Sequence, residues 1–216
     1  MERFKTLKDH VYDYIADQIK NGNLLPGQRV NENSICEELN ISRTPVREAL
    51  IQLSAEGVLE NLARKGFVIR SMTEADISEL YAVIGILDGY AAKLACNKLT
   101  EADYADMEFY IDTMDLAIKS ANYSMYYKQQ VIFHQLYIDR CGNSVLIDTI
   151  DKAKNKLLRK SYTEDESGAT QKIFYATNAE HRTILELFRK KDEDGLFKFL
   201  SETHWMPTYA AYDTIL

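Results

Sequence analysis

Proline, glycine and cysteine are all scarce in this chain of 216 residues, which contains three prolines, nine glycines and three cysteines. Cys36, Cys96 and Cys141 lie far apart and show no CxxC spacing, so they give no indication of a cysteine metal site. We expect all three to be reduced thiols in the core or on the surface.

Long apolar runs are missing as well. No stretch approaches the ~20 apolar residues that a membrane helix needs, and the first five residues lack the apolar segment of a signal peptide. The hydrophobic content of 46% is nevertheless sufficient for two compact domains. We therefore expect a cytoplasmic protein without a membrane partner.

An excess of positive charge is also missing, because the net charge of -7 at first argues against a nucleic-acid partner. The deficit is uneven, since residues 1–72 contain ten basic and ten acidic residues, whereas residues 73–216 contain sixteen and twenty-three. A local basic patch binds phosphate while its neutral surroundings limit nonspecific affinity. Such a patch is predicted from four residues: Arg43, Arg47, Arg64 and Lys65.

Arg43 and Arg47 stand one helical turn apart at the start of an amphipathic helix. We expect Thr44 to cap this helix through its hydroxyl and Pro45 to occupy the first helical position, where a missing N–H costs nothing. A helix N-terminus flanked by arginines suits a phosphate and a guanine edge. The opposite, apolar face is formed by Val46, Ala49, Leu50 and Leu53.

Two further helices are predicted upstream of the arginines. Apolar residues between Val11 and Ile19 recur at helical spacing, and the chain then breaks at residues 24–27. Ser34–Glu37 has the form of a capping box that opens a short helix, and Asn40–Ser42 turns the chain into the arginine helix.

A basic hairpin is predicted downstream. Residues 58–62 and 67–70 have the composition of strands and enclose residues 63–66, which include Arg64 and Lys65. A helix, a helix-turn-helix and a wing in this order predict a winged helix-turn-helix domain over residues 1–72.

The motifs of this region resemble the N-terminal domain of GntR-type bacterial transcription regulators. The match covers residues ~8 to 70 with consistent spacing, whereas an isolated basic helix would be weak evidence. The motifs that carry it are Leu25–Gly27, Ser42–Leu50, Glu56–Gly57 and the later Gly66.

The resemblance implies that Arg43 and Arg47 reach bases and phosphates of double-stranded DNA. Asn33 stands where relatives often place a basic residue, which puts one phosphate contact in doubt. The alternative is that the arginines are solvated surface charges paired with Glu48 or Glu56. The remaining implied contacts are Ser42 and Thr44 on the DNA backbone and Lys65 and Gly66 near the minor groove.

From Thr73 onward, strand signals vanish and apolar residues recur at helical spacing, which predicts an all-helical domain over residues 73–216 and a mainly α fold for the chain. Thr73 with Asp76, and Thr100 with Asp103, predict capped helix starts. The polar segment 163–168 is expected to be an exposed loop. Later helices are expected at residues 123–141, 144–161, 170–190 and 192–212.

Three histidines of this half, His134, His181 and His204, stand in contexts that resemble the FCD effector domain of FadR-like GntR regulators. In many members, three histidines and a carboxylate bind one divalent metal. The position of that carboxylate, four residues before His134, is here Gln130, a much weaker ligand. Two alternatives remain open: the histidines hold Zn or Ni with water completing the shell, or they line a polar cavity for an organic anion.

The expected effector pocket departs from the family at a second position. Relatives commonly carry an arginine four residues before an acidic residue, and here Asp88 matches the acid while Ile84 replaces the arginine. A simple dicarboxylate is therefore less expected than an aromatic or hydroxylated ligand. Tyr126 and Tyr137 flank His134 and are candidates to line the pocket, although most tyrosines are packing residues.

The pattern as a whole predicts a homodimeric transcriptional regulator, expected to be a repressor, that binds a palindromic operator and senses a small molecule. The alternative is a histidine-metal hydrolase tethered to nucleic acid. Against the hydrolase, no carboxylate stands at a general-base spacing to the histidines. Glu180, which precedes His181, is expected to project elsewhere on its helix.

Overall fold

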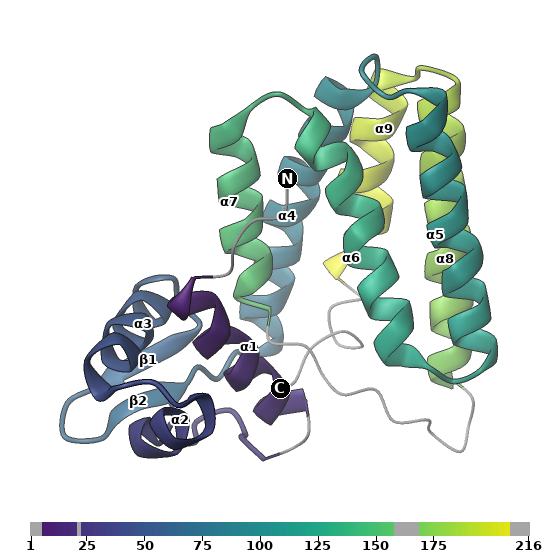
Figure 1. Cartoon of the computed structure of the whole chain (residues 1–216). Helices are drawn as coiled ribbons and strands as arrows, with labels where there is room; N and C mark the ends of the chain where they lie inside the picture. The colour runs from purple at the N-terminus through teal and green to yellow at the C-terminus, as the bar shows by residue number, and fades with distance from the viewer. Residues whose placement is uncertain (1–5, 21–22, 158–168, 208–216) are drawn as a thin grey trace. The chain divides into compact units, whose positions relative to one another are not determined.

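The computed structural model describes residues 6–20, 23–157 and 169–207 (Figure 1). The chain divides into two compact units. The winged unit holds the described residues up to Ile77 together with residues 154–157, and the helical unit holds residues 78–153 and 169–207. The predicted boundary after residue 72 falls just before the helix that begins at Glu74.

The winged unit is a three-helix cluster followed by a hairpin. The antiparallel strands pair Leu59 with Ile69 and Leu62 with Gly66. Arg29 forms a bridge to Val68, so the segment before the second helix adds to the hairpin edge. The elements are α1 (Leu7–Lys20), α2 (Glu32–Leu39), α3 (Arg43–Ala55), β1 (Leu59–Leu62) and β2 (Gly66–Ile69).

A single apolar core holds these elements together. The faces predicted for α1 and α3 are confirmed by the burial of Ile15 and Leu50, and α2 contributes buried Ile35. Burial of side chains of this size stabilises the fold by about 1.5–3 kcal/mol each. Between α2 and α3, Asn40 takes the left-handed conformation with φ 52°, which asparagine tolerates, and so makes the predicted turn.

Two predicted helix starts in this unit were wrong. α2 begins before Ser34, with Asn31 as N-cap, whose side chain accepts a hydrogen bond from the Asn33 N–H at 3.0 Å. α3 begins at Arg43 with Ser42 as N-cap, so Thr44 does not cap it and Pro45 is its third residue. Proline is tolerated throughout the first turn, whose N–H groups have no partners within the helix, and so it did not distinguish Ser42 from Thr44.

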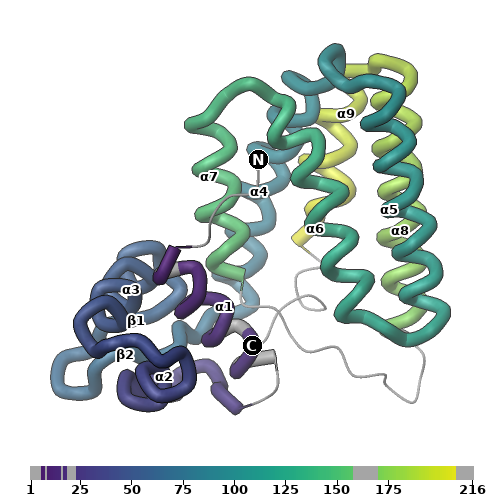
Figure 2. The backbone as a smooth tube through the Cα atoms, viewed as in Figure 1, coloured from purple at the N-terminus to yellow at the C-terminus, as the bar shows by residue number. Residues whose placement is uncertain are grey.

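The helical unit packs α5 against both α6 and α8, and α8 against α9 and η1 (Figure 2). Among the described helices, none combines the length and apolar character needed to cross a bilayer. The elements are α4 (Glu74–Ala95), α5 (Glu101–Lys119), α6 (Tyr123–Arg140), α7 (Ser144–Asn155), α8 (Ala169–Arg189), α9 (Glu193–Phe199) and the π-helical turn η1 (Leu200–His204).

Both capping boxes predicted for this half are confirmed. The Thr73 N–H donates to Asp76 Oδ2 at 2.8 Å, and the Asp76 N–H donates back to Thr73 Oγ1 at 3.2 Å. Thr100 and Asp103 repeat the arrangement at the start of α5. The mainly helical fold with a small wing is also confirmed. The loop predicted at residues 163–168 lies outside the described residues. The helices predicted to reach residues 161 and 212 were too long, because α7 ends at Asn155 and η1 ends at His204.

Two glycines on α4 allow a close helix approach. A Cβ at Gly85 would lie 2.9 Å from Trp205 Cβ, and a Cβ at Gly89 would lie 2.9 Å from the Phe197 carbonyl oxygen. Any larger residue would therefore push α9 and η1 away from α4. The side chain between these glycines, Asp88, is thereby brought to the end of η1.

Candidate functional site

Three histidine rings from three different elements meet inside the helical unit. His134 comes from α6, His181 from α8 and His204 from η1, and all three are buried. One ring nitrogen of each lies within 4.8 Å of those of the other two. The Nε2 atoms of His134 and His204 are 3.1 Å apart.

The outer nitrogen of His134 is held by a buried tyrosine and a buried carboxylate. Its Nδ1 lies 2.6 Å from Tyr137 Oη and 3.2 Å from Asp88 Oδ2. Tyr137 donates its only hydroxyl hydrogen to Asp88 Oδ1 at 2.5 Å, so it has only an acceptor left for His134. The proton of a neutral His134 is therefore assigned to Nδ1, which leaves a lone pair on Nε2.

His204 is oriented in the same way by Glu180, whose Oε2 lies 2.9 Å from His204 Nδ1. This contact corrects the expectation that Glu180 projects away from the histidines. Glu180 does point differently from its neighbour His181 on α8, but packing places η1 against α8 and so brings His204 to it. A carboxylate acceptor assigns the Nδ1 proton to His204 and leaves a second lone pair on Nε2.

His181 has a neutral partner. Its Nδ1 lies 3.3 Å from Asn178 Oδ1, and its Nε2 is buried without a hydrogen-bond partner among the described residues. A buried polar atom without a partner is costly, and its presence calls for an explanation. A cation bound by Nε2 would be one.

The inner nitrogens of His134 and His204 have the spacing of two ligands of one metal ion, and a ring nitrogen of His181 lies within 4.8 Å of theirs. Two lone pairs 3.1 Å apart, as on His134 and His204, repel each other unless a proton or a cation lies between them. Nitrogens bound side by side to Zn²⁺ at about 2.0–2.1 Å lie about 3.0–3.4 Å apart, which matches the observed separation. Outer N–H groups bound to carboxylate or carbonyl oxygens are the usual support of metal-binding histidines.

Burial keeps two groups of the cluster in the protonation states that this arrangement needs. Burial, helped by the proximity of His204 and His134, lowers the pKa of His181 well below 6.5, so that this ring is neutral at neutral pH. Burial also raises the pKa of Tyr137 well above 10.0, and the neighbouring Asp88 acts in the same direction. Tyr137 thus remains a hydroxyl donor.

The other residues expected at this site lie around the cluster. Gln130 is buried on α6, one helical turn before His134. Tyr126 is also buried, and its ring stacks on Phe174 with centroids 4.5 Å apart. Ile84 is buried on α4, so the position of the family's arginine is apolar.

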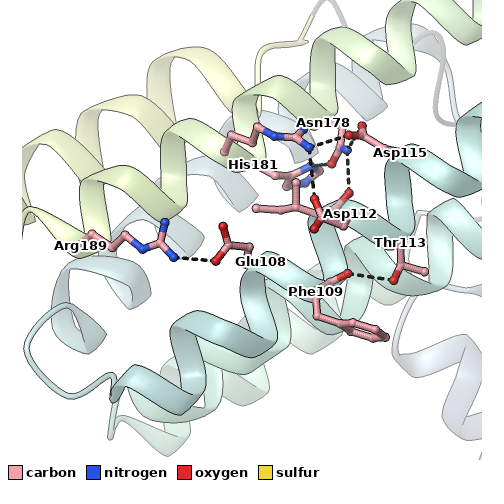
Figure 3. A network of polar contacts seen from close by, with 10 residues as sticks. Glu108, Phe109, Asp112, Thr113, Asp115, Asn178, His181 and Arg189 are labelled. Atoms are coloured by element: carbon pink, nitrogen blue, oxygen red, sulfur yellow. Dashed lines mark hydrogen bonds and ion pairs between the residues drawn. The ribbon is translucent and has the colours of Figure 1, made fainter.

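A polar network leads from His181 to the surface of α5 (Figure 3). Asn178 donates to the Ile111 carbonyl oxygen at 3.0 Å and to Asp115 Oδ1 at 2.6 Å. Asp115 in turn accepts from exposed Arg182 at 2.5 Å. With both donors of its amide engaged, Asn178 presents its oxygen to His181.

Sequence reasoning missed Asn178 and Trp205 at this site, and it missed the contact of Glu180 with His204. The Trp205 indole N–H donates to Asp88 Oδ2 at 3.0 Å, and its ring lies 5.6 Å from that of His134. Asn178 stands one turn before His181, a spacing that could have indicated a partner. No local signal links Trp205 to Asp88.

The residues expected to contact DNA are exposed in the winged unit. Arg43, Thr44 and Arg47 lie on the first turn and a half of α3, directly after exposed Ser42. Arg43 Nε lies 3.5 Å from Glu32 Oε2, and so its charge is partnered by α2. The other expected positions are exposed Asn33 on α2, exposed Lys65 at the hairpin tip and half-buried Gly66.

Arg29 is a further cation at the wing that sequence reasoning did not single out. It is exposed and paired with Val68, and its guanidinium lies 3.8 Å from where a Cβ of Gly66 would stand. Gly66 itself has φ +76°, a conformation that favours glycine. The wing therefore presents Arg29 next to Lys65 and Gly66.

Comparisons with known proteins agree with this architecture. Residues 7–69 match the family model of the bacterial regulatory proteins of the gntR family, and residues 79–202 match that of the FCD domain. The uncharacterized HTH-type transcriptional regulator YdhC of Bacillus subtilis (strain 168) is 28% identical over 189 residues, 85% of this chain and 81% of that protein. The Nta operon transcriptional regulator of Aminobacter aminovorans is 28% identical over 173 residues, 80% of each chain.

A solved structure shares the fold. E. coli McbR/YncC superposes with a TM-score of 0.76 over 97% of both chains, at 21% sequence identity. At this identity the likeness concerns the fold alone.

Proposed function

Because this chain belongs to the GntR family of bacterial regulatory proteins and carries an FCD domain, we propose that its helical unit binds one divalent metal and a small-molecule effector to control DNA binding by the winged unit. The family consists of HTH-type transcriptional regulators rather than enzymes, which removes the hydrolase alternative. The metal, the effector and the mode of DNA binding are the parts that we propose.

The metal proposal rests on one observation: three buried imidazoles bring a ring nitrogen each to within 4.8 Å of one another while their outer nitrogens are held. Imidazole ligands suit Zn²⁺ and Ni²⁺, and three of them leave at least one coordination position for water. When bound, the metal would supply a Lewis-acid contact for an oxygen of the effector. Gln130, buried one turn before His134, is a candidate to hydrogen-bond that water or effector.

The effector is proposed to be a hydroxylated or aromatic molecule rather than a simple dicarboxylate. A dicarboxylate effector would need a partner for its second carboxylate, and buried Ile84 cannot be one. The nearby carboxylate of Asp88, which accepts a hydrogen bond from Tyr137, would repel it. Tyr126 is kept as a weaker candidate for the pocket because its ring is buried against Phe174.

The DNA-binding proposal places Arg43 and Arg47 on bases and phosphates, Ser42 and Thr44 on the backbone, and the wing near the minor groove. Exposure of these side chains supports it, and Arg29 beside Gly66 is added to the expected contacts. We propose a homodimer on a palindromic operator, since two-fold symmetric proteins read two-fold symmetric sites. A dimer that covers its operator excludes other proteins from it, and so repression is the expected sign.

Metal content tests the central part of this proposal. Protein purified without a histidine tag or chelator is expected to contain close to one Zn or Ni per chain by mass spectrometry. His134→Ala removes one of three ligands and is expected to reduce the content to near zero. His10→Ala is the matched control, because His10 is exposed on α1 in the winged unit and should leave the content unchanged.

The same experiment separates the two interpretations of the cluster. Metal that is absent from wild type, or present equally in wild type and His134→Ala, would contradict a histidine-bound metal. The cluster would then be interpreted as the lining of a polar cavity for an organic ligand.

A further inference from the structure

The histidine cluster lacks negative charge among the groups that would touch a metal. Its three imidazoles are neutral when they act as ligands, and Gln130 contributes a neutral amide. A divalent cation in a buried site is costly unless opposite charge lies nearby. The compensating charge must therefore come from groups beyond the ligands.

Two carboxylates stand directly behind two of the three histidines. Asp88 Oδ2 lies 3.2 Å from His134 Nδ1, and Glu180 Oε2 lies 2.9 Å from His204 Nδ1. Resting on the metal site proposed above, we infer that Asp88 and Glu180 together balance the charge of a bound divalent cation, through His134 and His204, in place of a carboxylate ligand.

The Asp88 carboxylate is buried and held in place by hydrogen-bond donors. Its side chain is 0% exposed and accepts hydrogen bonds from Tyr137 Oη at 2.5 Å and Trp205 Nε1 at 3.0 Å. Gly85 and Gly89, on either side of it in α4, permit the close approach that makes the contact with Trp205. Several donors around one carboxylate stabilise its negative charge and fix its position.

Glu180 reaches the cluster from α8 and keeps 14% of its side chain exposed. Together, one negative charge on Asp88 and one on Glu180 equal the charge of a divalent cation. His181, by contrast, is held by neutral Asn178. The carboxylates thus act on two of the three ligands, His134 and His204. Their Nε2 atoms are therefore expected to be more basic than the metal-binding nitrogen of His181.

The test measures zinc affinity by competition with a chelator of known affinity. Asp88→Asn and Glu180→Gln each remove one charge with little change in volume and are expected to weaken zinc binding about 10–100-fold. Asp103→Asn is the matched control, because Asp103 is a buried carboxylate that caps α5 and pairs with Arg140. It is expected to leave the zinc affinity unchanged.

A charge rescue distinguishes compensation from a merely structural role. In the Glu180→Gln background, Gln130→Glu returns one negative charge at the position of the family's carboxylate ligand. It is expected to raise the zinc affinity by a larger factor there than in wild type, because only the Glu180→Gln site lacks a compensating charge. The visible spectrum of bound Co²⁺ is expected to keep its band positions in Glu180→Gln, since the ligand set is unchanged while the affinity falls.

The outcomes separate this inference from the metal site itself. Wild type that binds zinc with the same affinity as Asp88→Asn and Glu180→Gln would overturn charge compensation and leave the metal centre standing. Wild type that binds no zinc would overturn both. If Asp88→Asn does not fold, Glu180→Gln and its rescue decide alone, because partly exposed Glu180 tolerates substitution more readily.

Discussion

The winged unit and the helical unit carry their polar side chains in different places. In the winged unit, the described core residues are all apolar and the expected DNA contacts are exposed or half-buried. In the helical unit, polar groups lie inside. Every described buried residue of polar or charged type belongs to it: Asp88, Asp103, Gln130, His134, Asn178, His181 and His204.

The difference follows from the size and charge of what each unit is expected to bind. DNA is too large to enter a domain, so its contacts lie on the surface, and they are separate from the groups that stabilise the fold. A metal ion is small enough to be enclosed within a domain, and its proposed ligands His134, His181 and His204 lie among core residues. Substitutions should therefore separate function from stability in the winged unit and combine the two in the helical unit.

The largest expected effect is that of Phe133→Ala in the helical unit. Phe133 is 0% exposed, and its ring lies edge-on to that of His181 with centroids 4.8 Å apart. Truncation should lower the free energy of unfolding by about 3–5 kcal/mol and weaken metal binding together. Phe109→Ala on α5 is the control, because Phe109 is 62% exposed and its loss should change neither quantity. Unfolding by denaturant and metal content measure both, and a destabilised variant with wild-type metal affinity would break the link.

In the winged unit, Arg47→Ala should change DNA binding without changing stability. Loss of a base contact should weaken operator binding about 10–100-fold, while the thermal stability stays at the wild-type value because Arg47 is exposed. Lys65→Ala removes a positive charge of the wing that is expected near the minor groove, and so it should weaken binding to all sequences alike and lower the salt slope by about 1. Fluorescence anisotropy with operator and unrelated DNA checks both. Unchanged operator affinity in Arg47→Ala would refute its role.

The smallest expected effect concerns the pH dependence of stability. Burial raises the pKa of Asp103, but hydrogen bonds from the Thr100 backbone and the Arg140 guanidinium outweigh it and hold the pKa below 3.8. A carboxyl group with a depressed folded pKa stabilises the protein fully above its unfolded pKa, and this contribution is lost as the pH falls through the folded value. Asp103→Asn should therefore be less stable than wild type at neutral pH, with the difference shrinking below about pH 4. A difference that is constant with pH would contradict this assignment.

Much of the architecture could be predicted from local sequence, because its signals act over one or two helical turns. The boxes formed by Thr73 with Asp76 and Thr100 with Asp103 were identified correctly, since each is made by residues three apart. The starts of α2 and α3 were misplaced because several residues able to cap stand close together there. Which of these residues caps the helix depends on the path of the chain in the preceding turn. For α3, this turn is made at Asn40.

The sequence by itself determined a mainly helical chain with a wing, the arginines on α3, and three histidines to be sought in one place through family resemblance. Only the tertiary structure decided what surrounds the histidines. Glu180 contacts His204 across 24 positions, and Trp205 contacts Asp88 across 117. Such pairs depend on how η1 packs against α8 and how closely Gly85 and Gly89 let it approach α4. Helical periodicity describes the direction of a side chain on its own helix, but it does not describe the neighbour that packing brings to it.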